Sequence, residues 1–476
     1  MTDVDFSVEF EGFNEGYSPL AHVDSKTYVG NKGQASVMMA DLVSKPGFLT
    51  QSPGLAALTN GTQAGVVDQL IRFILDKPTA ADTTYALGTT KLFKLSSTTV
   101  ASGGSPSWPQ TVTNMTSGES LIRLKANLYG FYNKASGGDI LKMPLTTEVV
   151  TANWGSTTDA ALENAPHPCA VKEDIMLFGN GRYVGVYVEG AATLDCNKLD
   201  FGEGAEVADI VFHANMWWIA VNSGEGKRGQ IYMYDPAAVS NQLSDETGIG
   251  DQEIGFLYVK NGILFVCYKD LTSGALSIGY ISGRALKPLR YFSGTLPDHR
   301  QKALYKNTIV FLSSNEVWSF GSSVEQLPLQ ISKLSGGGYA TSGAIASPFG
   351  TPLISSTEST NYKIEKFSGV SVNSSWKSVF VDVTSQRLLG KIHTIIVTGK
   401  ELGANASCVI SLEGNQGAIS SSSHTYSGTG ITRKVFSNVA MRGVEDFRVV
   451  VDFAGGNTTN DCPIRKIVCL GSYEER

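Results

Sequence analysis

One short stretch of this sequence carries the residue types that a proton-transfer site needs. Asp298-His299-Arg300 places a carboxylate, an imidazole and a guanidinium side by side, and such groups can exchange a proton when they are within hydrogen-bond reach. The stretch directly follows Pro297, a residue type that favours turns. We therefore predict an exposed loop between two groups of strands here, and no catalytic residue.

Two further motifs match known binding motifs as strings of letters. Gly224-Glu-Gly-Lys-Arg-Gly229 fits the dinucleotide-binding fingerprint, but that fingerprint must open a helix, whereas Gln230–Tyr234 alternates like a strand. His167-Pro-Cys169 is the one close His/Cys pair, and a metal site of this type needs a second pair with similar spacing. The sequence thus predicts a protein that is not an enzyme and that has neither a cofactor nor a metal site.

A degenerate repeat organises the middle of the chain. Each unit has an apolar strand, a turn and a second apolar strand, and Asn180-Gly and Asn261-Gly are strong hairpin signals. Successive turns are spaced by about 45 residues, a period typical of propeller blades. We predict an all-β chain with a six- or seven-bladed β-propeller, the alternative being two ordinary sandwiches in tandem. The turns are expected near Asp82, Asn127, Asn180, Asn215, Asn261, Asn307 and Gly350.

The composition changes on either side of this repeat. Residues 1–70 contain turn clusters such as Gln51-Ser-Pro-Gly-Leu, which indicate an irregular N-terminal arm able to supply a strand that closes the ring. The propeller is predicted over residues 71–370. Longer alternating strands such as Phe447–Phe453 follow, and they predict a C-terminal β-sandwich or jelly roll over residues 371–476.

Aromatic residues are concentrated in the predicted blades. At alternate strand positions they are more typical of a packed core than of a sugar-binding platform, and neighbouring Trp217 and Trp218 must face opposite sides of a strand. One of these two tryptophans is expected between blades. The set comprises Tyr183, Trp217, Trp218, Tyr232, Tyr234, Tyr268, Tyr280 and Trp318.

The charge of the chain argues against a dedicated DNA-binding protein. The formal net charge is −6; residues 373–476 carry 11 basic and 9 acidic side chains, so the preceding residues carry −8. An acidic surface gains no affinity from counterion release, but DNA could slide past it without sticking. The alternative, that these acids serve solubility alone, stays open.

The cysteines and the N-terminal residues indicate the cellular compartment in which the protein is made. The six cysteines are scattered, which favours free, buried thiols over a disulfide scaffold. The first ten residues show neither the basic nor the apolar region of a signal peptide, and no apolar stretch approaches the length of a membrane span. We expect synthesis in a reducing cytoplasm and no export by that route.

The order of parts resembles the tail-nozzle proteins of short-tailed bacteriophages, also described as packaged-DNA stabilisation proteins. Pro46-Gly-Phe-Leu49 and Ser52-Pro-Gly-Leu55 are similar to a passage in that family's N-terminal arm. The strand Gly390–Gly399, followed by Cys408–Leu412 and Glu413-Gly-Asn, is similar to its terminal β-module.

The resemblance implies a structural virion protein located in the tail and made in the host cytoplasm. It implies a homo-oligomeric ring, six copies in that family, below the portal and adaptor, contacting a tail fibre or tip. Such a ring would retain packaged DNA and release it, the DNA passing without specific binding. The alternatives are a receptor- or glycan-binding propeller of a virion and a secreted propeller glycosidase. The lack of a recognisable signal peptide counts against the glycosidase.

Overall fold

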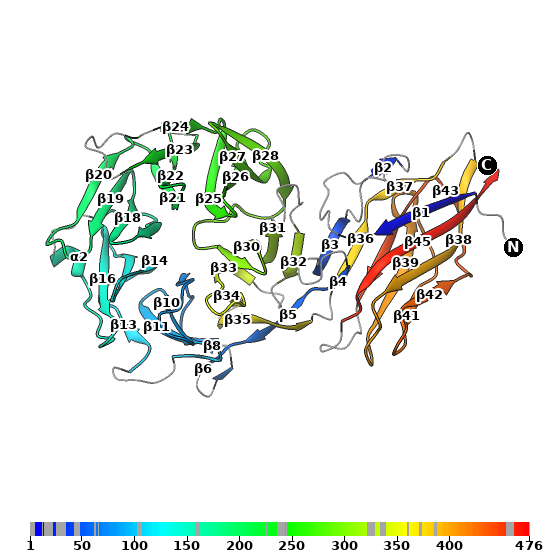
Figure 1. Cartoon of the computed structure of the whole chain (residues 1–476), viewed down its shortest axis with the longest axis horizontal. Coiled ribbons are helices and arrows are strands. Elements are labelled where there is room, and N and C mark those ends of the chain that lie inside the picture. The colour runs from blue at the N-terminus through cyan, green and yellow to red at the C-terminus, as the bar shows by residue number, and fades with distance from the viewer. Residues whose placement is uncertain are drawn as a thin grey trace.

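The computed structural model is built almost entirely of strands (Figure 1), and the prediction of an all-β chain is confirmed. Among the described residues the helical elements are α2 (Trp154–Thr157) and the 3-10 turn η1 (Asn415–Gly417). No helix in that part of the chain is long and apolar enough to cross a membrane. The structure describes residues 5–11, 13, 22–24, 35–41, 48–60, 63–64, 66–101, 107–157, 162–224, 226–235, 243, 245–320, 329–333, 339–358, 361–370, 374–384, 388–453 and 461–475.

Seven small, mainly antiparallel sheets follow one another within the described part of residues 53–370. Figure 1 shows them arranged around a common centre, and we call this body the ring. The five middle sheets are each made of three or four consecutive strands. Their strands are β14 (Ser117–Leu124), β15 (Asn127–Asn133), β16 (Gly138–Pro144); β17 (Cys169–Lys172), β18 (Ile175–Asn180), β19 (Tyr183–Val188), β20 (Asp195–Asp200); β21 (Glu206–His213), β22 (Met216–Ser223), β23 (Arg228–Tyr234), β24 (Asp245–Gly248); β25 (Gln252–Lys260), β26 (Ile263–Asp270), β27 (Leu276–Ser282), β28 (Ala285–Phe292); β29 (Lys302–Tyr305), β30 (Thr308–Ser313), β31 (Glu316–Phe320) and β32 (Leu329–Lys333).

The first and last sheets of the ring are completed by strands from early in the chain. In the first sheet β12 pairs with β6, and in the last sheet β35 pairs with β5 and β8. The first sheet contains β6 (Thr59–Asn60), β7 (Gln63–Ala64), β9 (Phe73–Ile74), β10 (Thr83–Leu87), β11 (Lys91–Ser96), β12 (Thr99–Val100) and β13 (Gln110–Thr111). The last contains β5 (Pro53–Ala57), β8 (Val66–Val67), β33 (Tyr339–Ala346), β34 (Leu353–Glu358) and β35 (Asn361–Val370).

The first strands of the sheets line the centre of the ring. β33 contacts β9, β9 contacts β14, and the contacts continue through β17 and β21 to β25, while β29 contacts β33. Hydrophobic clusters fill the spaces between neighbouring sheets. Each sheet therefore buries both of its faces against its neighbours, which a single small sheet could not do alone.

The predicted asparagine turns are present, with two small shifts. Asn180 is the last residue of β18, and the turn begins at Gly181, which has a φ of 60°. Asn215, Asn261 and Asn307 have φ values of 63°, 51° and 63°, in the left-handed region that asparagine tolerates. The turn expected at Asn127 lies slightly earlier, because Lys125 adopts a φ of 51° and Asn127 already begins β15.

The C-terminal strands form two further sheets, which we call the sheet pair. β39 alternates strictly between buried and partly exposed positions, and buried residues of both sheets meet in one core. One sheet contains β1 (Phe6–Glu11), β38 (Leu388–Gly399), β42 (Arg433–Phe436), β43 (Met441–Val444) and β45 (Ile464–Glu475). The other contains β2 (His22–Asp24), β3 (Ala35–Asp41), β4 (Thr50–Gln51), β36 (Ser375–Ser378), β37 (Phe380–Asp382), β39 (Ser407–Gly414), β40 (Ile419–Ser420), β41 (His424–Ser427) and β44 (Asp446–Asp452).

The described strands of residues 1–70 differ from the irregular arm that the sequence predicts. β1 pairs with β45, β2 with β37 and β3 with β36, so these strands belong to the sheet pair. β5 to β8 belong to the ring. Pro46 and residues 371–373, the predicted start of the C-terminal module, lie outside the described residues.

The chain crosses between the two bodies twice, and the crossings are bonded to each other. The backbone N–H of Ser52 donates to Ser374 Oγ at 2.8 Å, in a buried position. Core residues of the ring, among them Val310 and Ile345, share one hydrophobic cluster with Trp376 of the sheet pair. A double crossing with a common core resists bending more than a single linker does.

Removal of the Phe10 ring should destabilise the sheet pair. Phe10 is fully buried on β1 and meets Trp376 and Phe447 edge-on, with ring centroids 6.3 and 6.2 Å apart. We expect Phe10→Ala to lower the free energy of unfolding by about 3–5 kcal/mol in urea titrations. Ser7→Ala, an exposed position on the same strand, should change it by less than about 0.5 kcal/mol. Equal effects of the two would contradict an integral β1.

Candidate functional site

The polar stretch Asp298-His299-Arg300 connects two sheets, as predicted, but it lies at the centre of the ring and is largely covered, with 38% of the Asp298 side chain exposed. The connection from β28 to β29 brings His299 to 7% exposure, where its Nε2 lies 3.1 Å from the backbone oxygen of Glu119 on β14. The backbone oxygen of Arg300 accepts a hydrogen bond from the N–H of Ile345 on β33. The connection therefore reaches across the centre of the ring to β14 and also contacts β33 of the neighbouring sheet.

Arg300 is the centre of a partly buried ion-pair network. Its guanidinium lies 3.1 Å from Glu119 Oε2 and also donates to both carboxylate oxygens of Asp298. Burial opposes ionisation of Asp298, but the Arg300 guanidinium outweighs it and lowers the pKa of Asp298 to about 2. Glu119 accepts a further hydrogen bond from Ser117. Both carboxylates are thus occupied as acceptors.

A second buried ion pair joins three strands a short distance away. Lys302 on β29 pairs with Asp209 on β21 and donates to the backbone oxygen of Leu257 on β25 at 2.8 Å. Asp209 also accepts the backbone N–H groups of Leu257 and Ile210, at 2.7 and 2.9 Å. These bonds satisfy the charges and fix the spacing of the inner strands.

The other two motifs of the sequence, His167-Pro-Cys169 and Gly224–Gly229, lie within or next to strands of the ring. Nδ1 of buried His167 lies 2.8 Å from the Gly179 oxygen, and burial lowers the pKa of His167. Burial raises the pKa of Cys169 to about 12, so it stays a thiol. Among the described residues no group of three or more His, Cys, Asp or Glu side chains is placed to hold a metal. The Gly224–Gly229 segment, of which Glu225 lies outside the described residues, leads into the strand β23.

The six cysteines are free thiols, as predicted, and all except the half-buried Cys169 are buried.

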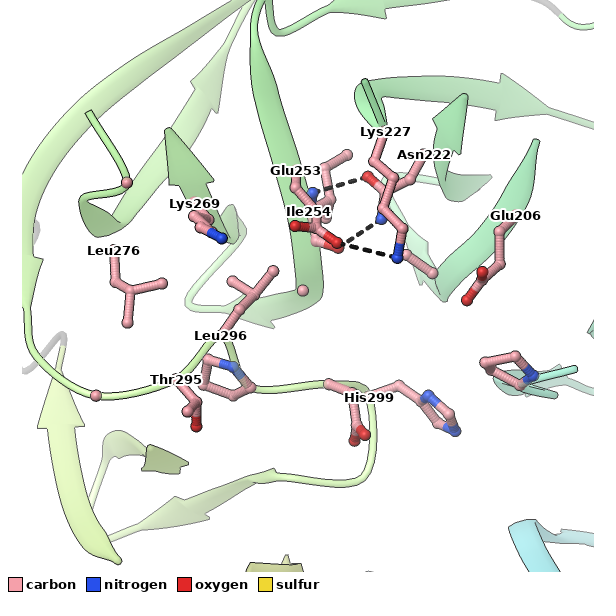
Figure 2. Close-up of a pocket in the computed structure, with 17 residues that line it drawn as sticks. Glu206, Asn222, Lys227, Glu253, Ile254, Lys269, Leu276, Thr295, Leu296 and His299 are labelled. Carbon is pink, nitrogen blue, oxygen red and sulfur yellow. Dashed lines mark hydrogen bonds and ion pairs between the residues drawn. The ribbon is translucent and has the colours of Figure 1, made fainter. Parts of the chain in front are cut away.

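A cavity of about 460 Å³ opens on one side of the central connection (Figure 2). The side-chain amide of Asn222 stabilises one wall of the cavity. It donates to the backbone oxygen of Ile254 at 2.9 Å and accepts a hydrogen bond from the Ile254 N–H at 2.8 Å. Lys227 lies 3.4 Å from Glu253 at the rim, and Glu206 faces the same space from β21. Apart from Lys227, which lies in the Gly224–Gly229 segment, no sequence motif marks these residues, because they come from separate strands and turns.

His299 lines this cavity and a second one of about 420 Å³, whose wall also includes Asp209 and Lys302. The connection that carries His299 therefore lies between two openings. The arrangement can bind polar groups at either mouth, but the charges at its centre already neutralise one another.

No protein-family model and no curated protein matches this chain. Solved structures with similar chain paths include the extracellular domain of a one-component system from B. thetaiotaomicron, with 12% identity, a TM-score of 0.46 and coverage of 74% of this chain but 45% of that chain. An exo-β-1,3-galactanase from Phanerochaete chrysosporium has 12% identity and a TM-score of 0.33, covering 88% and 100%. An aldose sugar dehydrogenase from Streptomyces coelicolor has 11% identity and a TM-score of 0.39, covering 66% and 98%. Likenesses this small assign no activity to the chain.

Loss of the Arg300 charge should be strongly destabilising. Arg300→Gln removes the cation that pairs directly with Glu119, whose side chain is 5% exposed, and loss of one partner of a buried ion pair costs about 3–5 kcal/mol. Urea unfolding followed by fluorescence would measure this. Arg228→Gln is the matched control, because Arg228 and its partner Asp251 are both exposed and such pairs contribute little. Comparable losses in the two variants would refute a special role for Arg300.

The stability of the protein should also fall below pH 6.5. Burial lowers the pKa of His167 and of His299 from an ordinary value of 6.5, although Asp298 opposes the shift of His299. The unfolded chain then takes up protons that the folded chain does not, so the free energy of unfolding decreases as the pH drops, by about 1.4 kcal/mol per pH unit for each histidine. Denaturation at pH 7.5, 6.5 and 5.5 should show this slope, reduced by about half in His299→Gln. A flat profile in the wild type would contradict it.

Proposed function

We propose that this chain is a non-catalytic structural protein of a bacteriophage tail, built as a seven-bladed propeller joined to a β-sandwich. The seven sheets of the ring support the blade number. The resemblance of the N-terminal and C-terminal motifs to tail-nozzle proteins supports the place in the virion. The division near residues 70 and 370 belongs to the same proposal, with the described N-terminal strands shared between both bodies.

The observation that carries the non-catalytic role is the ion pairing at the centre of the ring. Glycoside hydrolysis needs one carboxyl group as proton donor and another as base or nucleophile. Here Glu119 and Asp298 are both engaged by Arg300, and Asp209 is engaged by Lys302. A low pKa for Asp298 also removes it from the range of a general acid.

The filled centre of the ring limits where DNA could pass. The centre of each ring is filled by the connection that carries His299, so a conduit would lie between copies of the chain. We propose a homo-oligomer, a hexamer by the resemblance, docked to adaptor and portal proteins on one side and to a fibre or tip on the other. Acidic residues from the part of the chain with a net charge of −8 would face the DNA and repel it over about 8 Å.

Assembly is the direct test. We expect the purified chain to form a ring of several copies, measured by light scattering after gel filtration, with an opening wide enough for duplex DNA in electron micrographs. An antibody against the chain should label the tail of the parent particle. A protein that stays monomeric at high concentration, or a ring without an opening, would overturn the conduit; label elsewhere would overturn the location.

A further inference from the structure

A cavity of about 380 Å³ lies on the side of the ring opposite to the opening in Figure 2. β21 runs from Glu206, which lines that opening, to His213, which lines this cavity. Its other walls come from β22, from the turn between β25 and β26, and from the turn after β27. It therefore sits in the crevice between two adjacent sheets.

Trp218 forms a rigid wall of this cavity. Its indole N–H donates to the backbone oxygen of His213 at 3.0 Å, and its ring packs against the cluster that contains Leu264. Trp218 is nevertheless only half-buried, whereas its neighbour Trp217 is 2% exposed in the core on the other face of β22. The opposite facing of the two tryptophans agrees with the sequence prediction, and part of the outer ring remains free to contact a ligand.

The remaining polar groups of the cavity are hydroxyls and an imidazole, which can form hydrogen bonds. Tyr280 and Ser282 supply hydroxyls and His213 supplies an imidazole; within the described residues, none of these side chains has a hydrogen-bond partner. The glycines at the mouth, Gly262 and Gly283, have φ values of 74° and 62° with open space where a Cβ would stand. No side chain at these two positions closes the entrance.

We propose that this cavity binds a neutral carbohydrate. The apolar face of a sugar ring can stack on an indole, and its hydroxyls can exchange hydrogen bonds with Tyr280, Ser282 and His213. The volume falls in the usual range of small-ligand sites, roughly 300–1,000 Å³. No lysine or arginine lines the cavity, so an acidic sugar or a nucleotide finds no counter-charge. The inference concerns binding alone and is independent of the role in the tail.

The test uses the full chain and a panel of neutral monosaccharides and disaccharides, with sialic acid and AMP as anionic comparators. We expect saturation-transfer NMR to detect at least one neutral sugar. Tyr280→Phe should weaken its binding about fivefold to tenfold by removing one hydrogen bond, and Trp218→Ala should abolish it. Tyr291→Phe, at an exposed position of the same sheet, is the matched control and should bind like the wild type.

Three outcomes would overturn the proposal. They are the absence of binding by any neutral sugar, binding that Tyr280→Phe leaves unchanged, and binding of only the anionic comparators. If Trp218→Ala does not fold, Tyr280→Phe still decides the matter, because it removes a hydroxyl from a partly exposed side chain. A monomeric protein that binds the sugar would separate this inference from the proposed tail assembly.

Discussion

Pairing between the two ends of the chain is the constraint on which the rest of this structure depends. Leu55 of β5 lies opposite Phe367 of β35, and Phe10 of β1 lies opposite Ile467 of β45. Without β5 the last sheet of the ring would expose an unpaired edge, and without β1 the sheet pair would lose a strand and a buried aromatic ring. Both pairings close very long loops, whose entropic cost must be met by the burial that follows.

The consequence is a molecule whose two bodies are joined through packing and not through a single linker. The bond between Ser52 and Ser374 ties the two crossings, and one hydrophobic cluster runs from the last sheets of the ring into the sheet pair. A load applied to one body is therefore transmitted to the other. This property suits a component of an assembly that has to keep its shape.

The centre and the periphery of the ring use polar residues in different ways. At the centre, Arg300 and Lys302 form ion pairs with three carboxylates, two of which, Glu119 and Asp209, come from other sheets, so charge there holds strands in register. At the periphery, around Trp218 and Tyr280, the polar groups are hydroxyls and an imidazole without a hydrogen-bond partner within the described residues. Binding capacity is therefore expected where hydrogen-bonding groups remain unsatisfied, and structural rigidity where they are matched.

Much of the local structure could be predicted from the sequence by itself. Asn261-Gly262 predicted a tight turn because both residues tolerate positive φ, and the alternation in Phe447–Phe453 predicted the strand β44. The strands, the turns and the side of the sheet on which each side chain lies depend on backbone preferences and on the pattern of apolar residues over a few positions.

The position of the polar groups was decided only by the tertiary structure. Asp298-His299-Arg300 follows a proline and has the composition of an exposed loop, yet Arg300 is buried because Glu119 meets it from 181 residues away. The partners of β1 and β5 are likewise set by closure of the fold, and nothing local in residues 1–70 specifies them. A short sequence pattern records which conformation a segment prefers; which distant segment covers it depends on how all the sheets pack together.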